Sequence, residues 1–216
     1  MARAGVILDR DGTLIDVVRD ADLGVVVTAF HPDQIRLLPG VVEGLRALSA
    51  AGYALAIATN QPGAAKGQIP WRAIERTNAA LVTLLGAHGI SIAALEVCAH
   101  HPDGGPGGDP ALIGPCTCRK PAPGMLLRIL AALDLDPRQS WMIGDAAADV
   151  QAARAAGLRS GLLFDSRRCE LCPLRGGASA SGNANANANQ PPPDLGAARL
   201  DQLASAILEA ASPRIE

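Results

Sequence analysis

The chain has 216 residues and a formal net charge of −2 at pH 7. This length suits one domain with a substantial core and is short for two full domains. Because the chain has no basic excess, its bulk charge does not attract nucleic acid or an anionic membrane surface, and we expect neither as a partner. No run approaches the roughly 20 apolar residues of a membrane helix. We therefore expect a cytoplasmic monomer that acts on a small molecule.

Apolar runs and helical periodicities alternate along the chain. Ala4 to Leu8 predicts a buried strand, Val41 to Ser49 repeats apolar residues at helical spacing before Gly52, and Tyr53 to Ala58 predicts a second strand. The later predicted helices are 71–87, 124–133 and 149–156, and the later predicted strands are 94–97, 141–143 and 160–164. This alternation predicts an α/β fold with a parallel sheet covered by helices on both faces.

The composition divides the chain into three parts. We assign residues 1–175 to one catalytic domain. Residues 176–193 consist largely of Gly, Ala, Ser, Asn, Gln and Pro, which cannot bury enough apolar area to offset the entropy of ordering, so we predict a disordered linker. From Leu195 to Ala211 apolar residues return at helical spacing. We expect 194–216 to form a terminal helix that docks on the same domain.

Two carboxylates follow the first predicted strand, in the run Asp9-Arg10-Asp11-Gly12-Thr13. Carboxylates at positions i and i+2 can share one site, where one attacks phosphorus and the other moves a proton. Glycine permits the tight turn that brings backbone N–H groups towards a phosphate. An Asp-rich turn is the alternative interpretation. The position directly after an apolar strand favours the catalytic one.

Polar groups also end the second predicted strand and occupy a later loop. Thr59, Asn60 and Gln61 place a hydroxyl and two amides at the strand end, where they are suited to donating hydrogen bonds to phosphate oxygens, although a simple turn explains the same residues. Lys120 offers a charge that neutralises phosphate, and a solvated surface lysine is its alternative.

Asp145 follows the predicted strand 141–143. If it faces Asp9 across the sheet edge, the two carboxylates form the oxygen-rich kind of site that Mg²⁺ prefers. A carboxylate that caps a helix N-terminus is the alternative for Asp145, and it stays open for Asp149 as well.

These four sites, in this order, resemble the haloacid dehalogenase superfamily of phosphatases over about residues 6–163. The resemblance implies a Rossmann-like domain without a large cap domain, with Asp9 as nucleophile and Asp11 as general acid/base. It implies that Thr59 and Lys120 hold the phosphoryl group. It also implies that Asp9, Asp145 and, through its backbone carbonyl, Asp11 bind Mg²⁺.

Three of the five cysteines occur with a histidine at metal-ligand spacing. Cys98, His100, Cys116 and Cys118 supply three thiolates and an imidazole, enough for a closed tetrahedral Zn²⁺ site. Zinc would close the Gly- and Pro-rich loop 98–118 and fix the following residues beside the active site. Chance clustering of buried cysteines is disfavoured by the polar surroundings. The remaining pair, Cys169 and Cys172, is interpreted as two surface cysteines.

The metal-ligand pattern leading into Arg119 is similar to the zinc-containing subgroup of heptose bisphosphatases and histidinol-phosphate phosphatases. The runs His100-His101-Pro102 and 61–67 are closer to the heptose branch, although 16–30 is longer than the usual flap of that branch. The similarity implies that a small phosphorylated sugar loses its C7 phosphate, with Arg119 recognising the substrate's distal phosphate or sugar. We also expect Arg10, Asn60 and Gln61 to bind substrate. Histidinol phosphate, another small monoester, and a non-enzymatic zinc-stabilised binding module are the alternatives.

Overall fold

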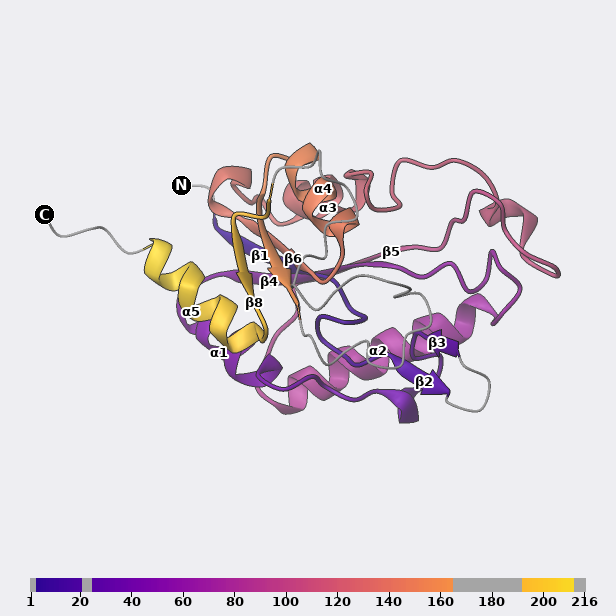
Figure 1. Cartoon of the computed structure of the whole chain (residues 1–216), viewed down its shortest axis with the longest axis horizontal. Helices are drawn as coiled ribbons and strands as arrows, with labels where there is room; N and C mark the ends of the chain where they lie inside the picture. Colours follow the sequence, from indigo (N-terminus) through magenta and orange to yellow (C-terminus); the bar gives the residue numbers. More distant parts are fainter. Residues whose placement is uncertain (1–2, 21–24, 165–191, 212–216) are drawn as a thin grey trace, which may run out of the picture.

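Figure 1 shows a computed structural model in which a central sheet lies between two layers of helices. The structure describes residues 3–20, 25–164 and 192–211. The expected linker 176–193 lies outside the described residues except for its last two positions, as do Cys169 and Cys172 entirely. No helix in the described ranges is long and apolar enough to cross a bilayer.

Six strands form the sheet in the order β5-β4-β1-β6-β7-β8, and every neighbouring pair is parallel. The strands are β1 (Gly5–Leu8), β4 (Ala54–Asn60), β5 (Ala94–Cys98), β6 (Trp141–Gly144), β7 (Arg159–Leu163) and β8 (Leu195–Ala197). Leu8, the last residue of β1, is in register with Ile57 of β4 and Ile143 of β6. The residues that follow these positions therefore reach the same edge of the sheet.

Helices cover both faces of the sheet, as the α/β prediction requires. The helices are α1 (Val41–Ala50), α2 (Trp71–Ala87), α3 (Gly124–Ala132), α4 (Ala147–Ala155) and α5 (Leu200–Ala211), with 3₁₀ turns at η1 (Pro32–Gln34), η2 (Pro110–Leu112) and η3 (Pro137–Gln139). One core joins α1, α2 and α5 to the sheet, and a second core joins α3 and α4 to the opposite face. Figure 1 shows these two groups on opposite sides.

Side chains of β1 alternate between the two cores. Val6 and Leu8 enter the core under α1, α2 and α5, whereas Ile7 enters the core under α3 and α4. All three side chains are fully buried. A strand buried on both faces reads as a continuous apolar run, which explains why this strand was predictable.

The segment between β1 and α1 carries an antiparallel pair of short strands, β2 (Val18–Asp20) and β3 (Val25–Val27). These two strands form a sheet separate from the main one. In the described ranges no large cap domain interrupts the fold, as predicted.

The C-terminal segment differs from the predicted helix over 195–211. Residues Leu195–Ala197 instead form β8 at the edge of the sheet, paired with β7, and α5 begins only at Leu200. Asp194 fixes this strand, since its Oδ2 accepts hydrogen bonds from both the backbone N–H and the hydroxyl of Ser160, each at 2.7 Å. The open edge of β7 offers unpaired backbone groups, and their hydrogen bonds override the local helical pattern.

Candidate active site and zinc cluster

The predicted catalytic residues lie at the carboxyl edge of the sheet. Asp9 directly follows β1 and donates its backbone N–H to the carbonyl of Ile143 in β6 at 2.8 Å. Thr59 lies near the end of β4, and Asp145 directly follows β6. In parallel α/β sheets ligands bind outside this edge, where strand ends and helix starts meet.

Lys120 joins the central strands through its buried ammonium group. Its Nζ lies 2.8 Å from Oδ1 of Asp9 and 2.7 Å from Oδ1 of Asp149, and it donates to the carbonyl of Ala58 at 2.8 Å. The Lys120 side chain is only 2% exposed. Burial lowers the pKa of Lys120, but the two carboxylates outweigh burial and raise it above its ordinary value. The residue is therefore a fixed cation within the site.

The nucleophile candidate Asp9 has an unusual charge environment. Burial raises its pKa, Lys120 opposes this, and the charges of Asp149 and Asp145 add to the rise, with a net pKa of about 7. Three carboxylates thus lie together, and the one lysine cation beside them contacts two, Asp9 and Asp149. This excess of negative charge favours a further cation at the site.

The chemistry of the donor set fits Mg²⁺. One carboxylate oxygen each from Asp9, Asp145 and Asp149 lies within 4.8 Å of the others. Gly12, with φ +78°, lets the chain pass against Asp145, because a Cβ at this position would collide with that carboxylate. Oxygen ligands and several negative charges are what this hard cation requires.

Asp11 lies beside this cluster, but its side chain is engaged elsewhere. Its Oδ1 accepts from Nη2 of Arg10 at 3.1 Å and from the hydroxyl of Thr28 at 2.5 Å. Its Oδ2 accepts from Nε of Arg10 at 3.1 Å and from Nε2 of Gln61 at 2.6 Å. The same Gln61 amide donates to Thr59 Oγ1 at 2.9 Å. A hydrogen-bond network thus links the acid/base candidate to a phosphate-binding candidate.

Arg10 and Asn60, both predicted to bind substrate, use their side chains for internal contacts. Arg10 is fully buried, and its guanidinium reaches Asp11, Asn78 and the carbonyl of Ala29. The Asn60 amide accepts from the backbone N–H of Lys120 and donates to the Lys120 carbonyl, both at 3.1 Å. In this structure Asn60 therefore fixes the peptide that carries the lysine.

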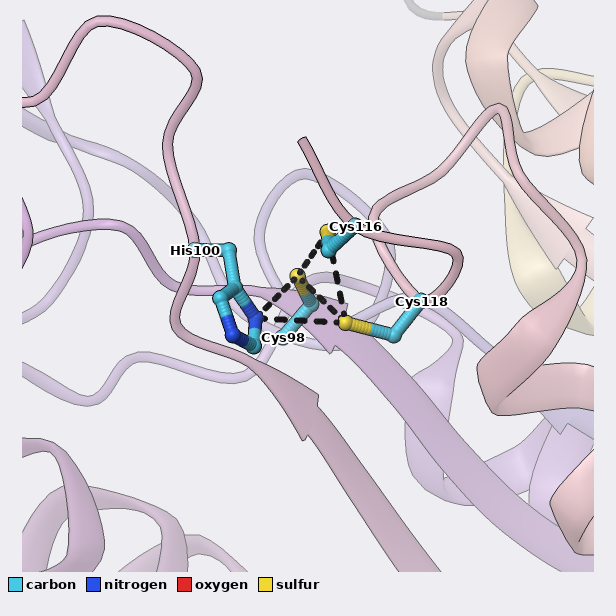
Figure 2. Close-up of side chains that lie close together, drawn as sticks. All are labelled: Cys98, His100, Cys116 and Cys118. Carbon is cyan, nitrogen blue, oxygen red and sulfur yellow. Dashed lines mark hydrogen bonds between the residues drawn. The ribbon is translucent and has the colours of Figure 1, made fainter. Parts of the chain in front are cut away.

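The four predicted zinc ligands point towards one another at the end of β5 (Figure 2). The sulfur of Cys98 lies 3.7 Å from that of Cys116 and 3.1 Å from that of Cys118, and the last two sulfurs are 3.5 Å apart. Nδ1 of His100 lies 3.8 Å from the Cys98 sulfur and 3.4 Å from the Cys118 sulfur. In a tetrahedral site with Zn–S bonds of about 2.3 Å, ligand atoms lie roughly 3.5–3.8 Å apart. The donor set therefore fits zinc, and four of the five separations lie within about 0.1 Å of this range, whereas the Cys98–Cys118 separation is shorter.

The cysteine cluster connects directly to the active site. The backbone N–H of Arg119 donates to the Cys116 sulfur at 3.4 Å, and its guanidinium donates to the carbonyl of His100 at 3.3 Å. Lys120 is the next residue. The cluster is therefore joined to Lys120 through the single residue Arg119, and the Lys120 ammonium contacts Asp9.

Comparisons with known proteins agree with this site. Residues 117–165 match the model of the HAD-hydrolase-like family. The D-glycero-beta-D-manno-heptose-1,7-bisphosphate 7-phosphatase of Pasteurella multocida is 33% identical over 161 residues, which cover 74% of this chain and 81% of that protein. The chain belongs to this phosphatase family. The phosphatase of the same name from Escherichia coli K12 is 34% identical over 158 residues, covering 73% and 77% of the two chains.

A solved structure supports the same family membership. The D,D-heptose 1,7-bisphosphate phosphatase from B. bronchiseptica, complexed with magnesium and phosphate, matches this phosphatase with a TM-score of 0.70. The two proteins are 27% identical, and the match covers 96% of this chain and 99% of that one. The predicted membership of the haloacid dehalogenase superfamily is confirmed.

Sequence reasoning left three residues of this phosphatase site outside the predicted set. Asp149 was interpreted as a possible cap, and it does accept from the backbone N–H of Ala146 at 3.1 Å, yet its other oxygen binds Lys120. Asn78 in α2 and Thr28 after β3 both contact Arg10. Asn78 could have been noticed in the sequence, because it is a polar residue among the apolar positions of the helix that became α2. Thr28 gave no comparable signal.

Proposed function

We propose that this phosphatase removes the C7 phosphate of D-glycero-D-manno-heptose 1,7-bisphosphate through an aspartyl-phosphate on Asp9. The contact of Asp9 with the buried Lys120 is the observation that carries the proposal. The names of the relatives and of the B. bronchiseptica structure support the sugar substrate. A small phosphorylated sugar is therefore the partner class that we assign.

The first half-reaction transfers the phosphoryl group to the protein. A carboxylate oxygen of Asp9 forms a bond to phosphorus while the bond from phosphorus to the C7 oxygen breaks. Asp11 gives its proton to the departing oxygen, so that the sugar leaves as an alcohol. Lys120 and the Thr59 hydroxyl hold the phosphoryl oxygens. These fixed groups stabilise the charge that develops on the oxygens.

The second half-reaction restores the enzyme. The Asp11 carboxylate takes a proton from a water molecule, which attacks phosphorus. The bond between phosphorus and the Asp9 oxygen breaks, and inorganic phosphate leaves. Asp9 returns as a carboxylate and Asp11 as an acid, so one water is consumed for each ester hydrolysed.

We assign Mg²⁺ to Asp9 and Asp145, with the backbone carbonyl of Asp11, and note that Asp149 belongs to the same carboxylate cluster. When bound there, the cation neutralises charge on the phosphate and on the carboxylates. The magnesium and phosphate in the B. bronchiseptica structure support this assignment. The excess of acidic groups over lysine around Asp9 supports it independently.

We assign Zn²⁺ to Cys98, His100, Cys116 and Cys118, as a structural ion. All four positions carry protein ligands, and a closed site of this kind holds a fold together without reacting. Its role would be to hold Arg119 and Lys120 against the active site. The contact of the Arg119 N–H with the Cys116 sulfur supports this role.

Recognition of the sugar falls to groups around the phosphate site. We assign Arg119 to the distal phosphate, because its guanidinium makes one protein hydrogen bond within the described part of the chain and suits an anionic oxygen pair. Gln61 is buried and its amide donates to both Asp11 and Thr59, so its proposed effect on the substrate acts through these two residues.

A substrate panel tests the proposal. Purified protein with Mg²⁺ is assayed for phosphate release from the heptose 1,7-bisphosphate, histidinol phosphate and p-nitrophenyl phosphate. We expect kcat/KM for the heptose bisphosphate to exceed the other two by about 100-fold or more, since a second charged recognition contact contributes roughly 3 kcal/mol. Equal values for all three would refute the sugar assignment. Absence of turnover with every substrate in the presence of Mg²⁺ would refute the phosphatase and favour a binding module.

A further inference from the structure

Arg10 lies between the two reactive aspartates, yet its side chain is fully buried. A buried guanidinium is costly unless each of its donors has an acceptor. Here Nε and Nη2 grip the two oxygens of Asp11, each at 3.1 Å, and Nη1 donates to Oδ1 of Asn78 at 2.6 Å. Nη2 also donates to the carbonyl of Ala29 at 3.2 Å. The side chain is thus fully committed within the protein.

Asn78 gives this arginine a rigid anchor. It lies in α2 and is 4% exposed, within the helix that places Ile74, Leu81 and Leu85 in the core. An asparagine in a helix interior is unfavourable for the local backbone, and burying its amide adds a further cost. The short hydrogen bond to Arg10 accounts for its presence there.

We infer that Asn78 and Arg10 are positioning residues for Asp11, with Arg10 clamping the carboxylate and Asn78 holding Arg10 against α2. The inference rests on the proposed role of Asp11 as general acid and base. Thr28 adds a third anchor, since its hydroxyl contacts Asp11 and Arg10 from the segment that follows β3. The clamp holds the Asp11 carboxyl group in one orientation, and a proton transfer depends steeply on such placement.

Substrates with different leaving groups distinguish a positioning role of Asn78 from a purely structural one. An alkyl phosphate needs a proton on its departing oxygen, whereas p-nitrophenolate departs without one. The ratio kcat/KM reports steps up to phosphoryl transfer onto Asp9 and so isolates the acid role of Asp11. A misplaced Asp11 should therefore slow an alkyl ester far more than an aryl ester.

The experiment compares Asn78→Ala, Asn78→Asp and Thr77→Ala in the full chain, with glycerol 3-phosphate and p-nitrophenyl phosphate as substrates. Asn78→Ala removes the acceptor for Arg10, and Asn78→Asp keeps an oxygen in its place. Thr77→Ala is the matched control, because Thr77 is also buried in α2 but its hydroxyl donates to the carbonyl of Ala73.

We expect Asn78→Ala to lower kcat/KM for glycerol 3-phosphate by about 10-fold or more and for p-nitrophenyl phosphate by less than about 2-fold. Asn78→Asp should restore most of the loss, and Thr77→Ala should leave the ratio of the two substrates unchanged. The inference, but not the proposed function, would be overturned if Asn78→Ala lost activity equally on both substrates or on neither. An Asn78→Asp variant as slow as Asn78→Ala would overturn it in the same way. A wild-type protein that hydrolyses neither of these esters nor the heptose 1,7-bisphosphate would overturn the proposed function and this inference with it.

Discussion

The Lys120 ammonium lies 2.8 Å from Oδ1 of Asp9, with the two side chains 2% and 15% exposed. Removing the lysine should leave the carboxylates of Asp9 and Asp149 without their shared cation, and unpaired buried charge is strongly unfavourable. We predict that Lys120→Met lowers kcat by about 100-fold or more, because a fixed charge on the phosphoryl group is lost.

The same variant should change the pH dependence. Lys120 lowers the pKa of Asp9 from a still higher value to about 7, so its removal should raise that pKa further. Asp9 attacks as a carboxylate, and the acidic limb of kcat/KM should therefore move to higher pH. Arg199→Met, which removes an exposed ion pair with Asp201, is the control and should not move this limb. An unchanged limb in Lys120→Met would contradict the assignment.

Asp9→Asn tests the nucleophile. An amide oxygen is a poor nucleophile, so we predict a loss of turnover of about 10⁴-fold or more. The amide has nearly the shape of the carboxyl group and removes one charge from a crowded acidic cluster. Thermal unfolding should therefore stay within a few degrees of the wild type. Phosphate release by Asp9→Asn at the wild-type rate would contradict the proposed mechanism.

Gly12→Ala tests the close approach of the first loop to Asp145. The residue has φ +78°, and a Cβ would meet the Asp145 carboxylate, so the substitution should displace a predicted Mg²⁺ ligand. We predict about a 10-fold or greater rise in the Mg²⁺ concentration for half-maximal activity. Gly89→Ala is the matched control, since Gly89 has φ +75° but nothing within 4 Å of the added atom. Both variants carry the backbone penalty, and only Gly12→Ala should affect metal dependence.

Removal of the proposed zinc ion should loosen the loop that leads into Lys120. We predict one zinc per wild-type chain by elemental analysis, and its loss in Cys118→Ser or after chelation. Because the cluster closes a Gly- and Pro-rich loop, the unfolding temperature should fall by about 5 °C or more. Wild-type protein that is purified without zinc and keeps its full stability would rule out a structural ion.

Asp194→Asn tests the docking of β8. Burial raises the pKa of Asp194, but the hydrogen bonds from Ser160 outweigh it and hold the pKa below its ordinary value. A carboxyl group with a lowered folded-state pKa stabilises the fold above its unfolded pKa of about 3.9, and this stability is lost as the pH falls through the folded-state value. The variant should be less stable by at most about 1 kcal/mol at pH 7, since the residue is partly exposed.

The difference between Asp194→Asn and the wild type should shrink as the pH falls below about 4. Urea unfolding at pH 7 and at low pH measures both values. Asp33→Asn, at a carboxylate that is 90% exposed, serves as the control. A stability difference that stays constant with pH would show that the charge of Asp194 does not stabilise β8.

The sequence alone determined the alternation of elements and the residue types of the site. Val6, Ile7 and Leu8 must be buried on both faces of a sheet, and such a run leaves few alternatives to a central strand. Because parallel strands end at one edge, the positions of Asp9, Thr59 and Asp145 followed from the strands themselves. The spacing of Cys98, His100, Cys116 and Cys118 likewise indicated that these four side chains would cluster.

Only the tertiary structure decided which groups meet. The contacts of Arg10 with Asn78 and of Lys120 with Asp149 join segments far apart in the chain, and no local pattern encodes a long-range pairing. The edge strand β8 shows the same limit. Leu195–Ala197 follow a helix-like apolar pattern, but the unpaired backbone of β7 satisfies their hydrogen bonds as a strand. The periodicity of a sequence indicates which side chains are apolar enough to be buried. The packing of the whole chain determines which segment buries them.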